Sequence, residues 1–131
     1  MMILPTLDHL YADGLSLLDL EKHYVLEDLP GQVRDWRTIL GDLARLKAGW
    51  RPDDAILADA PSLSDWAIVG NLDNNNVAQF VGTVIGHEKF PDYRVVRTSI
   101  ILALDTRDLR WARTVGRFYR LLKPEQPWTS M

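Results

Sequence analysis

Apolar residues in the first third of the chain recur at the spacing of one helix face. After Thr6, a residue type that caps helices, large apolar side chains follow at Leu7, Leu10, Tyr11, Leu17 and Leu18. Gly14 interrupts this run and weakens a helix there by roughly 1 kcal/mol relative to alanine. The pattern predicts a helix over residues 6–18, followed by a less regular segment that ends at Pro30-Gly31.

A longer amphipathic segment covers residues 31–48. Two neighbouring stripes give it a wide apolar face that has to be buried, and they consist of Val33, Trp36, Ile39, Leu40, Leu43, Leu46 and Trp50. Lys47 in the last turn and Gly49 beyond it are typical of a helix C-terminus. This segment is the strongest helix prediction in the chain.

Residues 52–60 have the composition of a short helix. Pro52 suits a first helical position, and Asp53 and Asp54 complement the positive end of the helix dipole. Pro61 then ends the helix. With the two segments above, the sequence predicts about three helices before residue 62.

After Pro61 the apolar residues become β-branched and aromatic. Strands are predicted over residues 65–70, 77–86 and 94–105, with an asparagine-rich hairpin loop at residues 71–76. Residues 107–122 fit either a helix or two strands, because Trp111, Val115, Phe118 and Leu122 are also spaced by four, three and four. The internal Gly116 and the β-forming composition favour strands there.

The predicted fold class is therefore α+β. About three N-terminal helices (residues 1–61) precede a small antiparallel β-sheet or SH3-like barrel of about five strands (residues 62–124). Residues 1–124 make one domain. Pro124 and Pro127 indicate that residues 125–131 form a C-terminal tail.

Composition narrows the chemistry that the chain can perform. The 131 residues include no cysteine, which excludes disulfides, zinc–thiolate sites and thiol nucleophiles and fits a reducing cytoplasm. The three histidines, His9, His23 and His87, lie too far apart in sequence to suggest a metal site. We expect a cytoplasmic protein without a signal peptide, membrane span, cofactor or metal.

The net charge of −3 hides an asymmetry between the two halves of the chain. Twelve of the 18 acidic residues lie before residue 67, and nine of the 15 basic residues lie after it. The acids offer a negative surface to a protein partner, with Asp35, Asp42, Asp53 and Asp54 as its candidate residues. The bases offer an arginine-rich surface to nucleic acid, with candidate residues Arg97, Arg110, Arg113, Arg117, Arg120 and the aromatic Tyr119. Mutual pairing of the two halves explains the asymmetry equally well.

The strand RVVRTSIILALD raises the question of catalysis, because it holds Arg97, Thr98 and Ser99 in an apolar run. In a regular strand Thr98 faces the core side with Val96, Ile100, Leu102 and Leu104, whereas Arg97 and Ser99 face the opposite side. A serine nucleophile also needs a base, and nothing indicates that His87 reaches Ser99. The sequence therefore predicts no enzyme and no catalytic residues.

Two stretches, GTVIGHEKFPDYRVVRTSIILALD and WARTVGRFYRL, carry a resemblance. They are similar to a pattern in small uncharacterised proteins of alphaproteobacteria and their phages and plasmids, and AGWRPDDAILADAPSLSDW resembles the segment before it. The matching positions are Gly82, Val84, Gly86, His87, Thr98, Ser99, Leu104, Asp105, Trp111, Arg113, Thr114, Arg117, Tyr119, Arg120 and Leu121. This chain departs from the pattern at Glu88, where proline is usual, and at Tyr93, where glycine is usual.

The resemblance implies a small β module in a mobile-element setting and transfers no mechanism. Together with the residues above, it leads us to expect a non-catalytic protein-binding or regulatory accessory protein, for example an inhibitor of a host defence complex. The alternative is a nucleic-acid-binding module that uses the arginine-rich C-terminal face.

Overall fold

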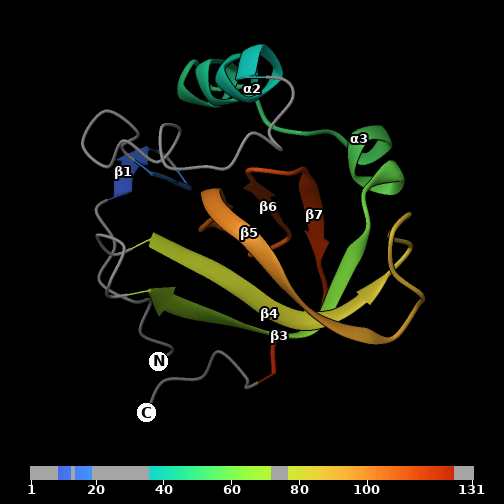
Figure 1. Ribbon diagram of the computed structural model, residues 1–131. Coiled ribbons are helices and arrows are strands. Elements are labelled where there is room, and N and C mark those ends of the chain that lie inside the picture. Colours follow the sequence, from blue (N-terminus) through green and yellow to red (C-terminus); the bar gives the residue numbers. More distant parts are fainter. Residues whose placement is uncertain (1–8, 13, 19–35, 72–76, 126–131) are drawn as a thin grey trace.

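The computed structural model describes residues 9–12, 14–18, 36–71 and 77–125 (Figure 1). The described part is mostly β. Seven strands and two helices follow one another as β1 (His9–Ala12), β2 (Leu15–Leu18), α2 (Trp36–Lys47), α3 (Asp54–Asp59), β3 (Ser62–Asn71), β4 (Val77–Ile85), β5 (Arg94–Asp105), β6 (Trp111–Thr114) and β7 (Phe118–Leu121).

Strands β3 to β7 form a closed barrel in which each strand pairs with the next along the chain. The neighbouring pairs from β3–β4 to β6–β7 are antiparallel, and β7 returns to pair with β3. Because five strands of alternating direction close the ring, the first and last must run the same way, and the β3–β7 pair is indeed parallel. The small β-barrel expected from the sequence is therefore present, and residues 107–122 contain strands rather than a helix.

The prediction of a helices-first α+β fold is wrong. Residues 9–18 form the β1–β2 hairpin instead of a helix, and β2 adds to the C-terminal half of β5. Gly14 makes the turn with a φ of 68°, a conformation that glycine adopts without strain. In β2, Leu15, Ser16 and Leu17 are all buried, so pairing with β5 overrides the helical spacing of the leucines. Residues 6–8 and 19–35 lie outside the described residues.

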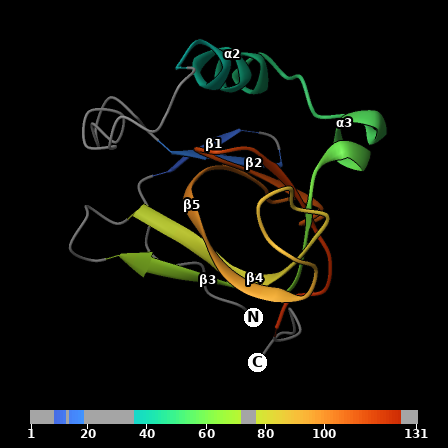
Figure 2. The same cartoon turned by 45° about the vertical axis from the view of Figure 1, so that its right-hand side comes forward.

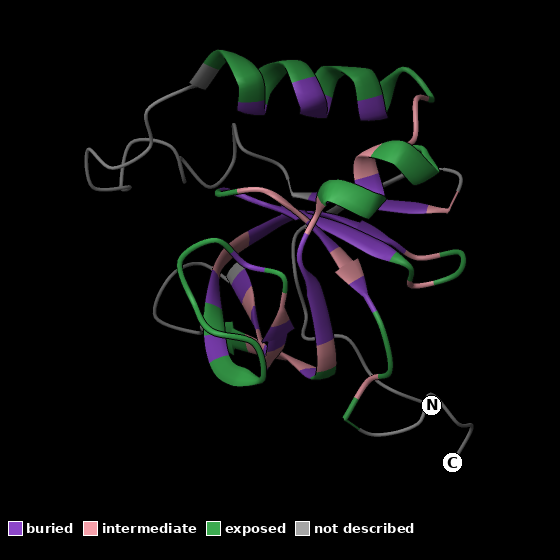
Figure 3. Ribbon diagram, turned by 90° about the vertical axis from the view of Figure 1, so that its right-hand side faces the viewer, coloured by how far each residue is buried: buried purple, intermediate pink, exposed green. Residues whose placement is uncertain are grey.

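Two of the predicted helices are present in the described residues. The helix α2 covers residues 36–47, and it buries Ile39, Leu43 and Leu46, whereas Leu40 of the predicted apolar face is exposed (Figure 3). Within 52–60 the helix α3 covers residues 54–59. Its N-cap is Asp53, whose carboxylate accepts the backbone N–H of Ile56 at 2.9 Å.

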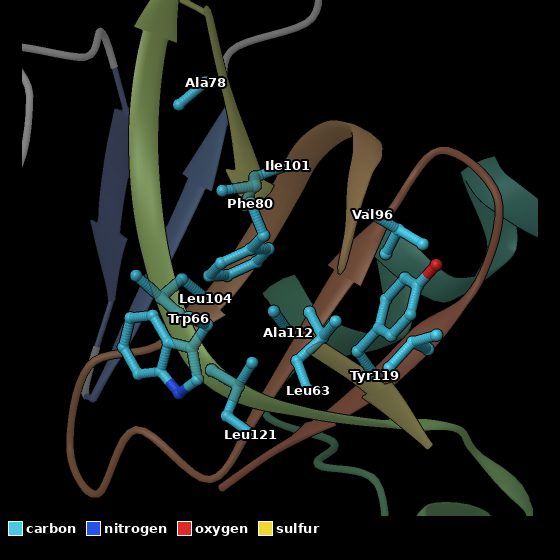
Figure 4. Packing of buried hydrophobic residues seen from close by; sticks show 11 residues of the cluster. Leu63, Trp66, Ala78, Phe80, Val96, Ile101, Leu104, Ala112, Tyr119 and Leu121 are labelled. Carbon is cyan, nitrogen blue, oxygen red and sulfur yellow. The ribbon is translucent and has the colours of Figure 1, made fainter. Parts of the chain in front are cut away.

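Buried side chains form two layers, one inside the barrel and one between the barrel and the helices. The barrel interior holds Leu63, Trp66, Phe80, Val84 and Tyr119 among others (Figure 4). The second layer joins α2, α3 and β2 to the outer face of the C-terminal half of β5, together with β6. Helices α2 and α3 lie on the same side of the barrel, away from the outer faces of β3 and β4 (Figures 1 and 2).

Strand β5 belongs to both layers, and this changes its pattern of burial. Residues 101–105 are all buried, because Ile101 and Leu104 point into the barrel cluster while Leu102 and Ala103 belong to the helix cluster. Irregularities in the pairing with β4 and with β6 shift the faces along the strand. The predicted single core face from Val96 to Leu104 therefore does not hold beyond Thr98.

Candidate functional site

The four acidic residues proposed for partner binding do not share one surface. Asp42, on α2, is buried and forms ion pairs with Arg45 and with Arg113 of β6, whose Nε lies 3.1 Å from its Oδ2. Asp53 and Asp54 are exposed at the start of α3, where Asp53 serves as the cap. Asp35 lies outside the described residues. Of these four residues, Asp53 and Asp54 are thus the ones seen exposed to a partner, and Asp42 instead joins α2 to the barrel.

The proposed arginine surface is divided among several places. Arg113 is buried, and its Nη1 donates to the carbonyl of Thr114 at 2.9 Å in addition to its ion pair with Asp42. Tyr119 lies inside the barrel, where burial raises the pKa of its hydroxyl. The remaining arginines reach the surface to different extents, and these are Arg97, Arg110, Arg117 and Arg120.

The surface arginines have distinct surroundings. Arg117 donates to Glu88 at 2.9 Å, and Arg120 donates from Nε and Nη2 to the hydroxyl of Ser62 at 3.0 and 2.6 Å. Arg110 lies 4.0 Å from Asp54, and both side chains are largely exposed. Arg97 is exposed on the N-terminal half of β5.

Thr98 and Ser99 have structural roles at the irregularity in β5. The Oγ1 of Thr98 accepts the backbone N–H of Phe80 at 3.0 Å, and the Thr98 carbonyl accepts the side-chain amide of Gln79 at 2.8 Å. The hydroxyl oxygen of Ser99 accepts the backbone N–H of Gly116 at 3.1 Å. These bonds stabilise the bulge, where β5 has two residues opposite Phe80 alone.

The most conspicuous exposed feature is the loop that joins β4 to β5, together with the start of β5. Five large hydrophobic residues are exposed in the described part of the chain, and three of them lie here: Phe90 (36%), Tyr93 (75%) and Val95 (65%). Arg94 and Arg97 lie beside them in sequence and are exposed as well. We call Phe90, Tyr93, Arg94, Val95 and Arg97 the tip surface.

Hydrogen bonds hold the loop behind the tip surface in one shape. Gly86, with a φ of 80°, donates its N–H to the Asp92 carboxylate at 2.8 Å, and Tyr93 donates its N–H to the Val84 carbonyl at 2.8 Å. Tyr93 itself has a φ of 70°, in the region that favours glycine. The resembling pattern usually has glycine at this position. The departure from glycine at Tyr93 is thus the feature of the sequence that marks this residue as unusual. The loop therefore presents an aromatic ring to solvent at some conformational cost.

His87 anchors the same loop from the inside. Its Nδ1 accepts the backbone N–H of Lys89 at 3.0 Å, and its ring lies 4.8 Å from the ring of Phe90 and 6.4 Å from that of Tyr119. Burial, and then the charge of Arg117, lowers the pKa of His87 below its ordinary 6.5. His87 is therefore neutral near pH 7 and serves as a hydrogen-bond acceptor within the loop. The rings of Phe90 and Tyr119 and the charge of Arg117 surround His87. The Ser99 hydroxyl is bonded instead to the backbone N–H of Gly116.

The sheet beside the loop continues the tip surface. On β4 the outward residues Val81 and Thr83 pair with Arg97 and Val95 of β5, and they are only half-buried, on a face of the barrel away from α2 and α3. β-Branched side chains in such a row make a flat, partly apolar strip. The strip and the tip surface together form the candidate functional site.

Comparison with known proteins gives no relative to guide the assignment: no protein-family model, curated protein or solved structure matches the chain. In the described residues, no group of three or more histidine, aspartate or glutamate side chains could hold a metal ion. The helices of that part are also too short or too polar to cross a membrane.

Proposed function

We propose that this protein is a non-catalytic binding module that docks a protein partner through the tip surface. The observation that carries the proposal is the gathering of Phe90, Tyr93 and Val95 on one ordered loop and strand end. Exposed apolar side chains that gather in this way mark interaction sites more often than isolated ones do. Tyrosine and arginine are also the residue types enriched at the energetic centres of protein interfaces.

The charges around the tip surface indicate the chemistry of the partner. Lys89, Arg94 and Arg97 are exposed there, and Glu88 is paired with Arg117. A partner surface with an apolar centre and carboxylates at its rim complements this arrangement. The proposal thus keeps a protein partner, as expected from the sequence, but moves the contact from the acidic helices to the β4–β5 end of the barrel.

The biological setting follows only from the resemblance stated above. A regulatory accessory protein of a phage or plasmid, acting in the cytoplasm on a host defence complex, suits a small module that binds without catalysis. The β4–β5 loop is also where this chain departs from the pattern, at Glu88 and Tyr93. We expect partner choice to differ within that group through this loop.

A matched set of variants tests the proposal. Tyr93→Asn with Val95→Thr removes the exposed ring and replaces one methyl group by a hydroxyl, while keeping residues that tolerate a left-handed turn and a strand, respectively. Leu40→Ser, on exposed α2, removes an apolar side chain of similar exposure elsewhere. In nuclease-treated pull-downs from host lysate, we expect the wild type and Leu40→Ser to retain the same protein partner and the double variant to lose it.

Two results would contradict protein binding at this surface. One is a partner retained equally by all three proteins, which would place the contact elsewhere. The other is loss of every partner on nuclease treatment, which would favour the nucleic-acid alternative. That second candidate draws support from the exposed Arg94, Arg97 and Tyr93 and from the Arg94 guanidinium, which lies 5.7 Å from the centre of the Phe90 ring, since arginines and stacked aromatics bind single strands. Its signature is an affinity that falls steeply with salt and a shallower slope in Arg94→Ala and Arg97→Ala.

A further inference from the structure

Two adjoining hollows lie on either side of α3, away from the tip surface. The first, about 400 Å³, lies where the β1–β2 turn, the α2–α3 connection and the β5–β6 turn meet, at Gly14, Pro52 and Arg107 among others. The second, about 340 Å³, lies between α3 and β7. Asp54, Leu57 and Arg110 line both hollows, so the two make one groove around the helix. Volumes of this size suit small ligands.

Arginines line the groove along its length. Arg51 and Arg107 belong to the first hollow, Arg120 belongs to the second, and Arg110 lies where they meet. The backbone holds Arg110 and Arg120 close together, because Leu121 donates its N–H to the Arg110 carbonyl at 2.8 Å and Trp111 pairs with Arg120 in the β6–β7 ladder. Arg110 directly precedes β6, and Arg120 lies in β7, so both belong to the β6–β7 hairpin.

The positive charge at Arg110 and Arg120 is only weakly balanced by the protein. Among the described residues, Arg120 has no carboxylate partner and donates to the neutral hydroxyl of Ser62. Arg110 has only the distant contact of 4.0 Å with the exposed Asp54. Asp105, which also lines the groove, is already bonded to the backbone N–H groups of the β5–β6 turn at Arg107, Asp108 and Arg110.

Apolar side chains complete the wall next to these charges. Leu57 and Leu121 are buried at the base of the second hollow, and Leu122 is exposed at its edge. A ligand with an anionic end and a flat or apolar body would place its anionic end against the arginines and its body over the leucines. Arginine presents a planar fork of N–H groups that matches phosphate oxygens in pairs.

We propose that this groove is a binding site for a phosphate group, held by Arg110 and Arg120, whose ligand body lies over Leu57, Leu121 and Leu122. The phosphate belongs either to a free nucleotide or to the backbone of a nucleic acid. The site is separate from the tip surface and does not depend on protein docking there.

The test is calorimetric titration of the full-length protein with ADP and, separately, with a single-stranded oligothymidylate of about twelve nucleotides. The variants are Arg110→Ala and Arg120→Gln, the second of which keeps a donor for Ser62. Arg37→Ala, on α2, is the matched control, because it removes one exposed arginine charge outside both the groove and the tip surface. Loss of a charge-assisted hydrogen bond predicts an affinity at least roughly tenfold weaker in each groove variant. The affinity of the control should not change.

The two sources of phosphate are separated by which ligand binds. Saturable binding of ADP that depends on both groove arginines supports the site and identifies a nucleotide-sized ligand. The same dependence for the oligothymidylate alone supports the site and identifies a nucleic-acid backbone. Absence of saturable binding of both ligands overturns the proposal, and so does an equal loss of affinity in Arg37→Ala. Circular dichroism of each variant verifies that the fold is retained.

Discussion

Replacing Asp42 by alanine tests the ion pair that holds α2 against the barrel. The Asp42 carboxylate and the Arg113 guanidinium are 10% and 4% exposed, and they join residues 71 positions apart in sequence. Burial lowers the pKa of Arg113 below its usual value, and the charge of Asp42 opposes that shift. The guanidinium is thus poorly hydrated, and it depends on the carboxylate as its counter-charge.

The two partners should differ in what their removal does to stability. Without Asp42, Arg113 stays buried with the carbonyls of Thr114 and Val115 as its acceptors, and breaking a buried pair in this way costs about 3–5 kcal/mol. Without Arg113, Asp42 still has Arg45 beside it. We therefore expect Arg113→Met to cost less, about 1–3 kcal/mol.

A double variant separates the charge from the packing. Asp42→Leu with Arg113→Met replaces both ions by apolar groups, and such replacements of a buried pair are often neutral or stabilising. We expect it to be more stable than Asp42→Ala alone. Urea unfolding followed by tryptophan fluorescence measures each free energy of unfolding. The exposed Asp59→Ala is the control and should change stability by less than about 0.5 kcal/mol.

The reasoning would be refuted by either of two outcomes. If Asp42→Ala loses less than about 1 kcal/mol, the guanidinium is well solvated or finds another acceptor, and the pair does not hold the helix. If the double variant loses the sum of the losses that Asp42→Leu and Arg113→Met cause singly, the residues do not interact energetically.

Two further predictions concern the β4–β5 loop and the barrel wall. Because the pKa of His87 is lowered in the folded state, the unfolded chain takes up a proton first, so stability should fall as the pH drops below about 6.5. His87→Asn keeps an acceptor for the Lys89 N–H without titrating, and its unfolding free energy between about pH 5 and pH 7 should fall less steeply; equal slopes would contradict this. A Cβ on Gly82 would lie 3.0 Å from Trp66 Cβ and 3.1 Å from its Cα, so Gly82→Ala should lose about 1–3 kcal/mol. Gly41 in α2 has nothing within 4 Å, so Gly41→Ala should instead gain about 0.5–1 kcal/mol, and similar effects at both glycines would refute the packing argument.

Some elements were predictable because their signals are local. The apolar spacing of Ile39, Leu43 and Leu46 predicted α2, and the order proline, aspartate and proline around residues 52–61 predicted α3. The β-branched and aromatic composition after residue 61 predicted the strands of the barrel, including β6 and β7. In these segments the backbone preference and the burial of the side chains agree.

The N-terminal hairpin was not predictable in the same way. The leucines of residues 7–18 fit a helix face, yet Leu15 and Leu17 are buried two positions apart against β5. The decisive partner lies about ninety residues away, where Leu15 pairs with Asp105. Local spacing shows which side chains are apolar, whereas the available strand edge decides which period buries them.

The candidate surfaces divide in the same manner. The absence of cysteine, the acidic first half and the arginine-rich second half can be read directly from the sequence. Only the tertiary structure decided that Arg113 neutralises Asp42 inside the protein, while Arg110 and Arg120 line a groove and Tyr93 is exposed. The reason is physical: charge and hydropathy belong to each residue, but burial and pairing depend on which distant segments pack against it.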